Sequence, residues 1–179
     1  MEKHRGRSEH AARAQEFDAF VAGAAGRLLH VATLLTAETR TRNPYAHALL
    51  TAALAHTYAV RARGGDEDPY ALTRDDLALR FARTAWRHRA GRGGVLGALT
   101  PRERLVLVLR LYEGVPEEQT AALLGLPEAR IRAVCARAVA RMRAGTTGGA
   151  AGPGAAGGRT TGSGAAGAGA GPGRGKAAA

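Results

Sequence analysis

Apolar residues recur every three or four positions along most of the chain, and almost no segment alternates between apolar and polar residues with a period of two. This spacing places apolar side chains on one face of a helix, so the ordered part is predicted to be all α-helical. We expect the first helix over residues 14–36. Its apolar stripe consists of Phe17, Phe20, Val21, Ala24, Leu28, Val31 and Leu35.

Local start and stop signals predict a second helix. Asn43 is a good N-cap residue, and Pro44 fits the first helical position, where its missing N–H would have no partner. The helix is expected to run to about Arg63, because the glycine- and proline-containing segment 64–69 interrupts it. Its apolar residues are Leu49, Leu50, Ala53, Leu54 and Tyr58.

A third helix is predicted from Thr73 to about His88, since Asp76 follows Thr73 at the spacing of a capping box. Its apolar face carries Leu77, Phe81 and Ala85, and another face carries Arg80, Arg83 and Arg87. These three arginines are candidate contacts to DNA phosphates, with a solvated helix face as the alternative. Trp86 is expected to pack in the core or at a domain interface.

Glycine is concentrated over residues 90–98, which we interpret as a linker between two small helical domains, 14–89 and 99–144. The second domain has a well-marked start. Thr100 is an N-cap residue, Pro101 follows it, and Glu103 stands at the reciprocal capping position.

Three helices are predicted in the second domain. The apolar run 105–112 is expected to be buried on most sides. A short helix over 116–124 then ends at Gly125, and the last helix covers 127–143. The remaining residues, 145–179, lack any large apolar side chain and are expected to be a disordered tail.

Residues 117–137 have the spacing of a helix-turn-helix. Ala121 stands where the two helices would cross and only a small side chain fits. Gly125 follows four residues later and supplies the positive φ of the turn. Ile131 comes six residues after that and would anchor the last helix in the core.

The outward face of the last helix is strongly basic, with five arginines and one acidic residue from position 127 to position 143. An α-helix fits the DNA major groove, where arginine can hold phosphates or contact guanine edges. The candidate DNA-binding residues of this helix are Arg130, Arg132, Ala133, Arg137 and Arg141. The alternative is an ordinary helical hairpin with a solvated arginine face.

The net charge agrees with a polyanionic partner. Twenty-six Lys and Arg residues against 15 Asp and Glu give a formal charge of +11. The tail holds three basic residues and no acidic ones, which leaves +8 on residues 1–144. The basic character therefore belongs to the helical body, and it favours nucleic acid or an anionic membrane face as partner.

Several classes of protein are disfavoured. A single cysteine excludes an internal disulfide framework and a cysteine-based zinc site, and the six histidines show no zinc-site spacing. No phosphate loop, nucleophile elbow or dinucleotide fingerprint is present, so we expect no enzyme, no cofactor and no metal. No apolar run approaches the ~18–20 residues of a membrane span, so a cytoplasmic protein is expected.

Residues 99–143 resemble region 4 of bacterial extracytoplasmic-function sigma factors. The resembling features are the Leu-x-Pro-x-x-Arg start, the VLVLRLYEG run, the ALLGLP turn and the closing Arg-Ala-x-Ala-Arg-x-Arg. The resemblance implies binding to the minus-thirty-five promoter element and to the flap of RNA polymerase. It implies DNA contacts at Arg132 and Arg137, whereas Arg130 and Ala133 depart from the residues common in the family.

The N-terminal half resembles region 2 of the same family through segments 17–21, 26–36 and 48–58, and through the stretch ending in Ala85-Trp86-Arg87-His88-Arg89. The resemblance implies contacts to the polymerase clamp and the minus-ten region. Two departures stand out. Positions where the family carries an acidic pair and a Gln for the clamp hold His47, Ala48 and Thr51. The loop expected to help melt the promoter holds Asp66, Glu67 and Asp68, which would repel phosphate.

The resulting hypothesis is a two-domain, all-helical promoter-specificity subunit whose partners are double-stranded promoter DNA and the RNA polymerase core. An anti-sigma factor is left open as a further partner. One rival is a stand-alone helix-turn-helix regulator that no longer binds the polymerase productively. A second rival is an interaction protein that sequesters polymerase or another regulator and has an incidental arginine surface.

Overall fold

A computed structural model describes residues 2–148. Within this part of the chain there are six α-helices and no β-strand, which confirms the all-α prediction. In chain order the elements are α1 (Glu2–Thr36), α2 (Pro44–Ala62), α3 (Pro69–Thr84), the 3-10 turn η1 (Ala85–His88), α4 (Pro101–Leu107), the π-helical turn η2 (Val108–Tyr112), α5 (Glu117–Leu124) and α6 (Glu128–Gly148). The predicted tail lies outside the described residues, except for positions 145–148, which continue α6.

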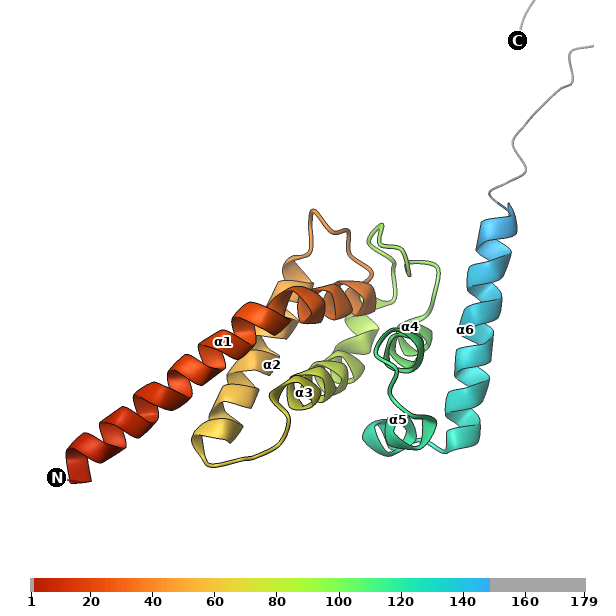
Figure 1. Ribbon diagram of the computed structural model, residues 1–179. Helices are drawn as coiled ribbons and strands as arrows, with labels where there is room; N and C mark the ends of the chain where they lie inside the picture. Colours follow the sequence, from red (N-terminus) through yellow and green to blue (C-terminus); the bar gives the residue numbers. More distant parts are fainter. Residues whose placement is uncertain (1, 149–179) are drawn as a thin grey trace, which may run out of the picture.

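Helices α2 and α3 pack against each other and against the C-terminal half of α1 (Figure 1). Leu28, Val31 and Leu35 of α1 and Leu77 and Phe81 of α3 are each at most 1% exposed. The predicted apolar stripe of the first helix is therefore buried in its C-terminal part, whereas its N-terminal residues are half-buried, namely Phe17, Phe20, Val21 and Ala24. The helix begins at Glu2, twelve residues before the predicted start. The N-terminal turns of α1 extend past the other helices (Figure 1).

Part of α1 is more apolar than the sequence analysis recognised. Residues 11–36 are long and apolar enough to cross a membrane, by length and composition alone. The expectation that no such segment exists is wrong, because short polar interruptions concealed it from a search for unbroken apolar runs. The C-terminal part of this segment carries the buried stripe that packs on α2 and α3, as the core helix of a globular domain does.

The start of α2 is capped by a residue that the sequence analysis did not consider. Asn43 occupies the N-cap position, but its side chain makes no capping hydrogen bond and donates instead to Thr33 Oγ1 at 3.2 Å. The buried carboxylate of Glu38 accepts from the backbone N–H of Tyr45 at 3.2 Å and of Ala46 at 2.8 Å. A carboxylate suits this place because the N-terminus of a helix carries partial positive charge.

The third helix begins at Pro69 rather than at Thr73, so its predicted start is wrong. Asp68 is the N-cap residue and accepts hydrogen bonds from the backbone N–H of Tyr70 and Ala71. Thr73 is fully buried one turn inside the helix, where its hydroxyl donates to the Pro69 carbonyl at 2.7 Å. The Asp-Pro pair is a complete start signal, and it precedes the threonine that resembled one.

The two halves of the chain share one hydrophobic core. Leu105, Val108 and Leu109 belong to the same buried cluster as the apolar face of α1, and α4 lies between α3 and α6 (Figure 1). The connecting segment is bound to the first half, since the Gly94 N–H donates to the Ala37 carbonyl at 2.9 Å. A Cβ on Gly94 would lie 2.4 Å from the Glu38 carbonyl oxygen, so the close approach requires glycine.

Polar contacts also connect the first half of the chain to the second half. The Glu113 side chain is 1% exposed and accepts from Arg27 Nε at 3.1 Å and from the Tyr70 hydroxyl at 2.9 Å. Arg104 is fully buried, and its Nη2 donates to the His88 carbonyl. Burial lowers the pKa of the Arg104 guanidinium. The halves are thus joined by apolar packing together with buried polar groups that each need a partner.

The second half begins and turns as the sequence predicts. Thr100 and Glu103 form a complete capping box at the start of α4. The run 105–112 is buried only in its first part, because Leu111 is 60% exposed and Tyr112 39% exposed. A second buried cluster of Val106, Ala121, Ile131 and Val134 joins α4 to α5 and α6.

We predict that Gly125→Ala lowers the free energy of unfolding by about 1–2 kcal/mol, because Gly125 has a φ of +63°, which strains a residue with a side chain. No atom crowds the Cβ position of Gly125, so a steric clash does not add to this cost. The matched control is Gly26→Ala in α1, where the Cβ position is also open. There the same change should stabilise by about 0.5–1 kcal/mol. Chemical denaturation measures both variants, and equal effects would show that the conformation of Gly125 is not the cause.

We predict that Tyr70→Phe destabilises the fold by about 1–2 kcal/mol through loss of a hydrogen bond to an ionised group. Burial, together with the hydrogen bond to Glu113, raises the pKa of Tyr70 to about 12 from its ordinary value of 10.0. The folded state therefore keeps a proton that the unfolded chain releases, and stability from Tyr70 falls as the pH rises from 10.0 to about 12. The stability difference between wild type and variant should shrink over this range, and a constant difference would contradict the assignment.

Candidate nucleic-acid interface

Helices α5 and α6 meet through a tight left-handed turn. Gly125 caps α5, and the Leu126 N–H donates to the Ala121 carbonyl at 3.0 Å. Ala121 is 7% exposed and Ile131 is fully buried, and both belong to the second buried cluster. The turn fixes the direction of α6, and the cluster fixes its rotation about its own axis.

That rotation turns the arginines of α6 to the solvent. Ile131, Val134 and Ala138 face inward and are at most 1% exposed. The candidate DNA-binding positions of the helix are all exposed, namely Arg130, Arg132, Ala133, Arg137 and Arg141. One side of a single helix is therefore available to a large polyanion.

Two of these arginines are held by carboxylates from the neighbouring helices. Arg132 Nη2 lies 2.6 Å from Glu117 Oε1 of α5, and Arg141 Nη1 lies 2.9 Å from Glu103 Oε2 of α4. Burial raises the pKa of Glu103, but hydrogen bonds from Thr100 and the charges of Arg141 and Arg137 outweigh burial and lower it. Glu103 consequently stays ionised at neutral pH.

A groove of about 460 Å³ runs beside α6, between this helix and the preceding segment. The residues that line it include Arg110, Arg132, Arg143, Glu117 and Cys135. Arg110 is held in place because its Nη1 donates to the Val115 carbonyl. Burial raises the pKa of the half-buried Cys135, so the thiol is neutral and the charge of the groove comes from the other groups.

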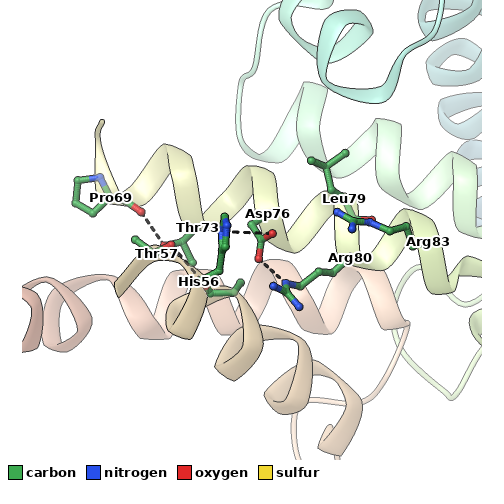
Figure 2. Close-up of polar contacts among 9 residues, drawn as sticks. His56, Thr57, Pro69, Thr73, Asp76, Leu79, Arg80 and Arg83 are labelled. Carbon is green, nitrogen blue, oxygen red and sulfur yellow. Dashed lines mark hydrogen bonds and ion pairs between the residues drawn. The ribbon is translucent and has the colours of Figure 1, made fainter. Parts of the chain in front are cut away.

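Two of the three candidate arginines of the first half, Arg80 and Arg83, are engaged by groups of their own helix (Figure 2). Arg80 forms an ion pair with Asp76 one turn earlier, and Asp76 also lies 3.6 Å from His56 Nδ1. Arg83 Nε donates to the Leu79 carbonyl at 3.3 Å. Asp76 thus pairs with Arg80 at i,i+4 within the helix, and it does not form a capping box with Thr73.

Arg87 completes this row beside an exposed aromatic ring. Its guanidinium carbon lies 4.9 Å from the centre of the Trp86 ring, which is 62% exposed. The expectation that Trp86 packs in the core or at a domain interface is wrong, because α3 ends at Thr84 and Trp86 lies exposed in the 3-10 turn that follows. With Arg80 and Arg83, Arg87 lines a groove of about 370 Å³ between α2 and the end of α3.

The structure does not bring the two sets of arginines into one site. The grooves lined by the α3 and α6 arginines share no residue. Within residues 2–148, no group of three or more His, Cys, Asp or Glu side chains could hold a metal ion. The molecule offers two separate basic surfaces, of which the one on α6 is the more exposed.

Sequence reasoning missed the carboxylates that hold the arginines. Glu117 and Arg132 are 15 positions apart, and Glu103 and Arg141 are 38 apart, so no local periodicity connects them. The available signal was an acidic residue in the first turn of each of the two helices; the sequence interpretation gave Glu103 a capping role and gave Glu117 no role. The ion pairs of these carboxylates with the arginines of α6 form only when the folded chain brings the helices together.

Comparison with known proteins agrees with this helix-turn-helix geometry. Residues 95–144 match the family model described as Sigma-70, region 4. The resemblance drawn from residues 99–143 is thereby confirmed for the C-terminal segment. The family match leaves the first half of the chain uncovered.

A relative is found among characterised proteins. Over 49 residues the chain is 43% identical to the RNA polymerase sigma-E factor of Streptomyces coelicolor. The aligned stretch spans 27% of this chain and 28% of that protein. No solved structure matches the chain.

Proposed function

We propose that residues 95–144 bind double-stranded DNA and that α6 enters the major groove. The observation that carries the proposal is the combination of a region 4 match with a helix whose inward face is anchored and whose exposed face is basic. An α-helix fits the major groove, and phosphate contacts from arginine would set its position there.

The proposed contacts follow from the placement of each residue. Arg130 and Arg137 are exposed and form no ion pair within 4 Å among the described residues, so they can reach phosphates or guanine edges directly. Arg132 and Arg141 lie on the same helix but first have to leave their carboxylates. Ala133 has no long side chain, which allows the helix backbone to approach the bases closely.

We further propose that the whole chain acts as a promoter-specificity subunit of RNA polymerase, of the extracytoplasmic-function type, in the cytoplasm. The N-terminal region 14–89 would then bind the polymerase clamp and the minus-ten region, with Arg80, Arg83 and Arg87 as its DNA contacts. This part of the proposal is supported by the sequence resemblance to region 2 and by the basic groove at the end of α3. No step of this function requires catalysis by the chain.

A specific observation favours a second candidate, a stand-alone DNA-binding regulator. His47, Ala48 and Thr51 are exposed along α2, where the family resemblance implies carboxylates and an amide for the clamp. Without those carboxylates the surface lacks the negative charge that the resemblance implies for the clamp contact. Core polymerase binding would then be lost while binding of α6 to DNA is kept.

We predict that Arg130→Ala and Arg137→Ala each weaken binding to duplex DNA, with a salt slope smaller by about 1 where the lost contact is to a phosphate. Arg63→Ala is the matched control, since it removes one exposed arginine at the far end of α2. Fluorescence anisotropy over a range of salt concentrations measures all three variants. If the control loses as much affinity as the two α6 variants, only net charge matters and the assigned face is wrong.

We predict that purified core polymerase together with this chain starts transcription at a defined site in a reconstituted run-off assay. The stand-alone regulator predicts a footprint on DNA without any specific transcript. Retention of labelled core polymerase by the chain, with no measurable DNA affinity, would instead favour a sequestering interaction protein. Specific transcription and DNA affinity, measured on the same preparation, therefore distinguish the three hypotheses.

A further inference from the structure

The groove beside α6 concentrates cationic groups around one carboxylate. Its lining includes Arg110, Arg132 and Arg143, and Glu117 is the one acidic residue among the described residues that line it. A groove lined by three arginines is a favourable place for an anion with several acceptor oxygens. The carboxylate present there belongs to the protein itself.

Glu117 is tightly placed within this groove. Its side chain is 20% exposed, and Oε1 lies 2.6 Å from Arg132 Nη2, whereas the Arg132 side chain is 69% exposed. Glu117 belongs to the first turn of α5, so its backbone position is fixed by a helix packed in the second buried cluster. Glu117 is therefore the less exposed member of the pair, held at its backbone by α5, and Arg132 is the member that is open to a second partner.

We propose that this groove is a binding site for a phosphate of the DNA backbone. In the free protein the Glu117 carboxylate takes the place of that phosphate as the ion-pair partner of Arg132. The inference rests on the proposed function, because the phosphate arrives only when α6 lies in the major groove. Arg132 exchanges Glu117 for the phosphate, so Glu117 is a positioning residue that acts through Arg132. The exchange limits the affinity for DNA of any sequence, because a phosphate contact depends on breaking an ion pair.

A second role explains why a carboxylate stands in a site for phosphate. Pro116 is the N-cap residue of α5 and makes no side-chain capping hydrogen bond. Glu117 and Glu118 supply negative charge to this uncapped helix start, which stabilises it. The neighbouring Glu118 is exposed and has no hydrogen bond or ion pair among the described residues, so it serves the helix start alone.

The test compares Glu117→Gln with Glu118→Gln in the full chain, using fluorescence anisotropy on a labelled duplex across a range of salt concentrations. Both variants change the net charge equally, within the same helical turn. We expect Glu117→Gln to bind about five-fold more tightly than wild type, with a salt slope steeper by about 1. Glu118→Gln should change affinity by less than about two-fold. Thermal melts establish that both variants are folded.

A double-variant cycle separates Glu117 from its general electrostatic field. In an Arg132→Ala background, Glu117→Gln should no longer raise the affinity, because the released arginine is absent. Three results would each overturn the inference. The affinity for DNA could rise equally in both glutamine variants, the rise in Glu117→Gln could persist without Arg132, or Glu117→Gln could bind DNA more weakly than wild type. If neither wild type nor any variant binds duplex DNA, the proposed function itself fails, which is a different outcome from a change in the ranking of variants.

Discussion

The arrangement of the molecule depends on α4, a short helix that is buried on two sides. Leu105 packs into the core formed by α1 and α3, while Val106 belongs to the cluster with α5 and α6. The capping box at its start fixes where this helix begins. Because α4 joins both clusters, it sets the position of α6 relative to the first half, and it leaves the arginine face of α6 open to solvent.

Charge is distributed around this apolar frame according to burial. Buried carboxylates such as Glu38 and Glu113 satisfy a helix start or join the halves, and each has several donors. Among the described residues, Arg132 and Arg141 of α6 each lie within ion-pair distance of one carboxylate. An exposed ion pair contributes little to stability, so these arginines can change partners at low cost. The same protein therefore combines fixed polar contacts inside with exchangeable ones on its basic face.

Local sequence signals predicted the parts of the fold that local interactions determine. The capping box at Thr100 and the left-handed turn at Gly125 each depend on a few neighbouring residues, and both occur where the sequence places them. The wrong start at Thr73 arose because two start signals lie within one turn, and the Asp-Pro signal is the stronger. Partners across the tertiary structure, such as Glu117 for Arg132, could not be predicted, since only the assembled helices bring them together.

The claim that α6 engages duplex DNA is tested most directly by a gel-shift titration of the chain against a labelled duplex at low ionic strength. Its basic exposed face predicts a discrete complex that dissociates as salt is added, because bound phosphates release counterions. The absence of any complex at low ionic strength, with the protein shown to be folded, would contradict the account.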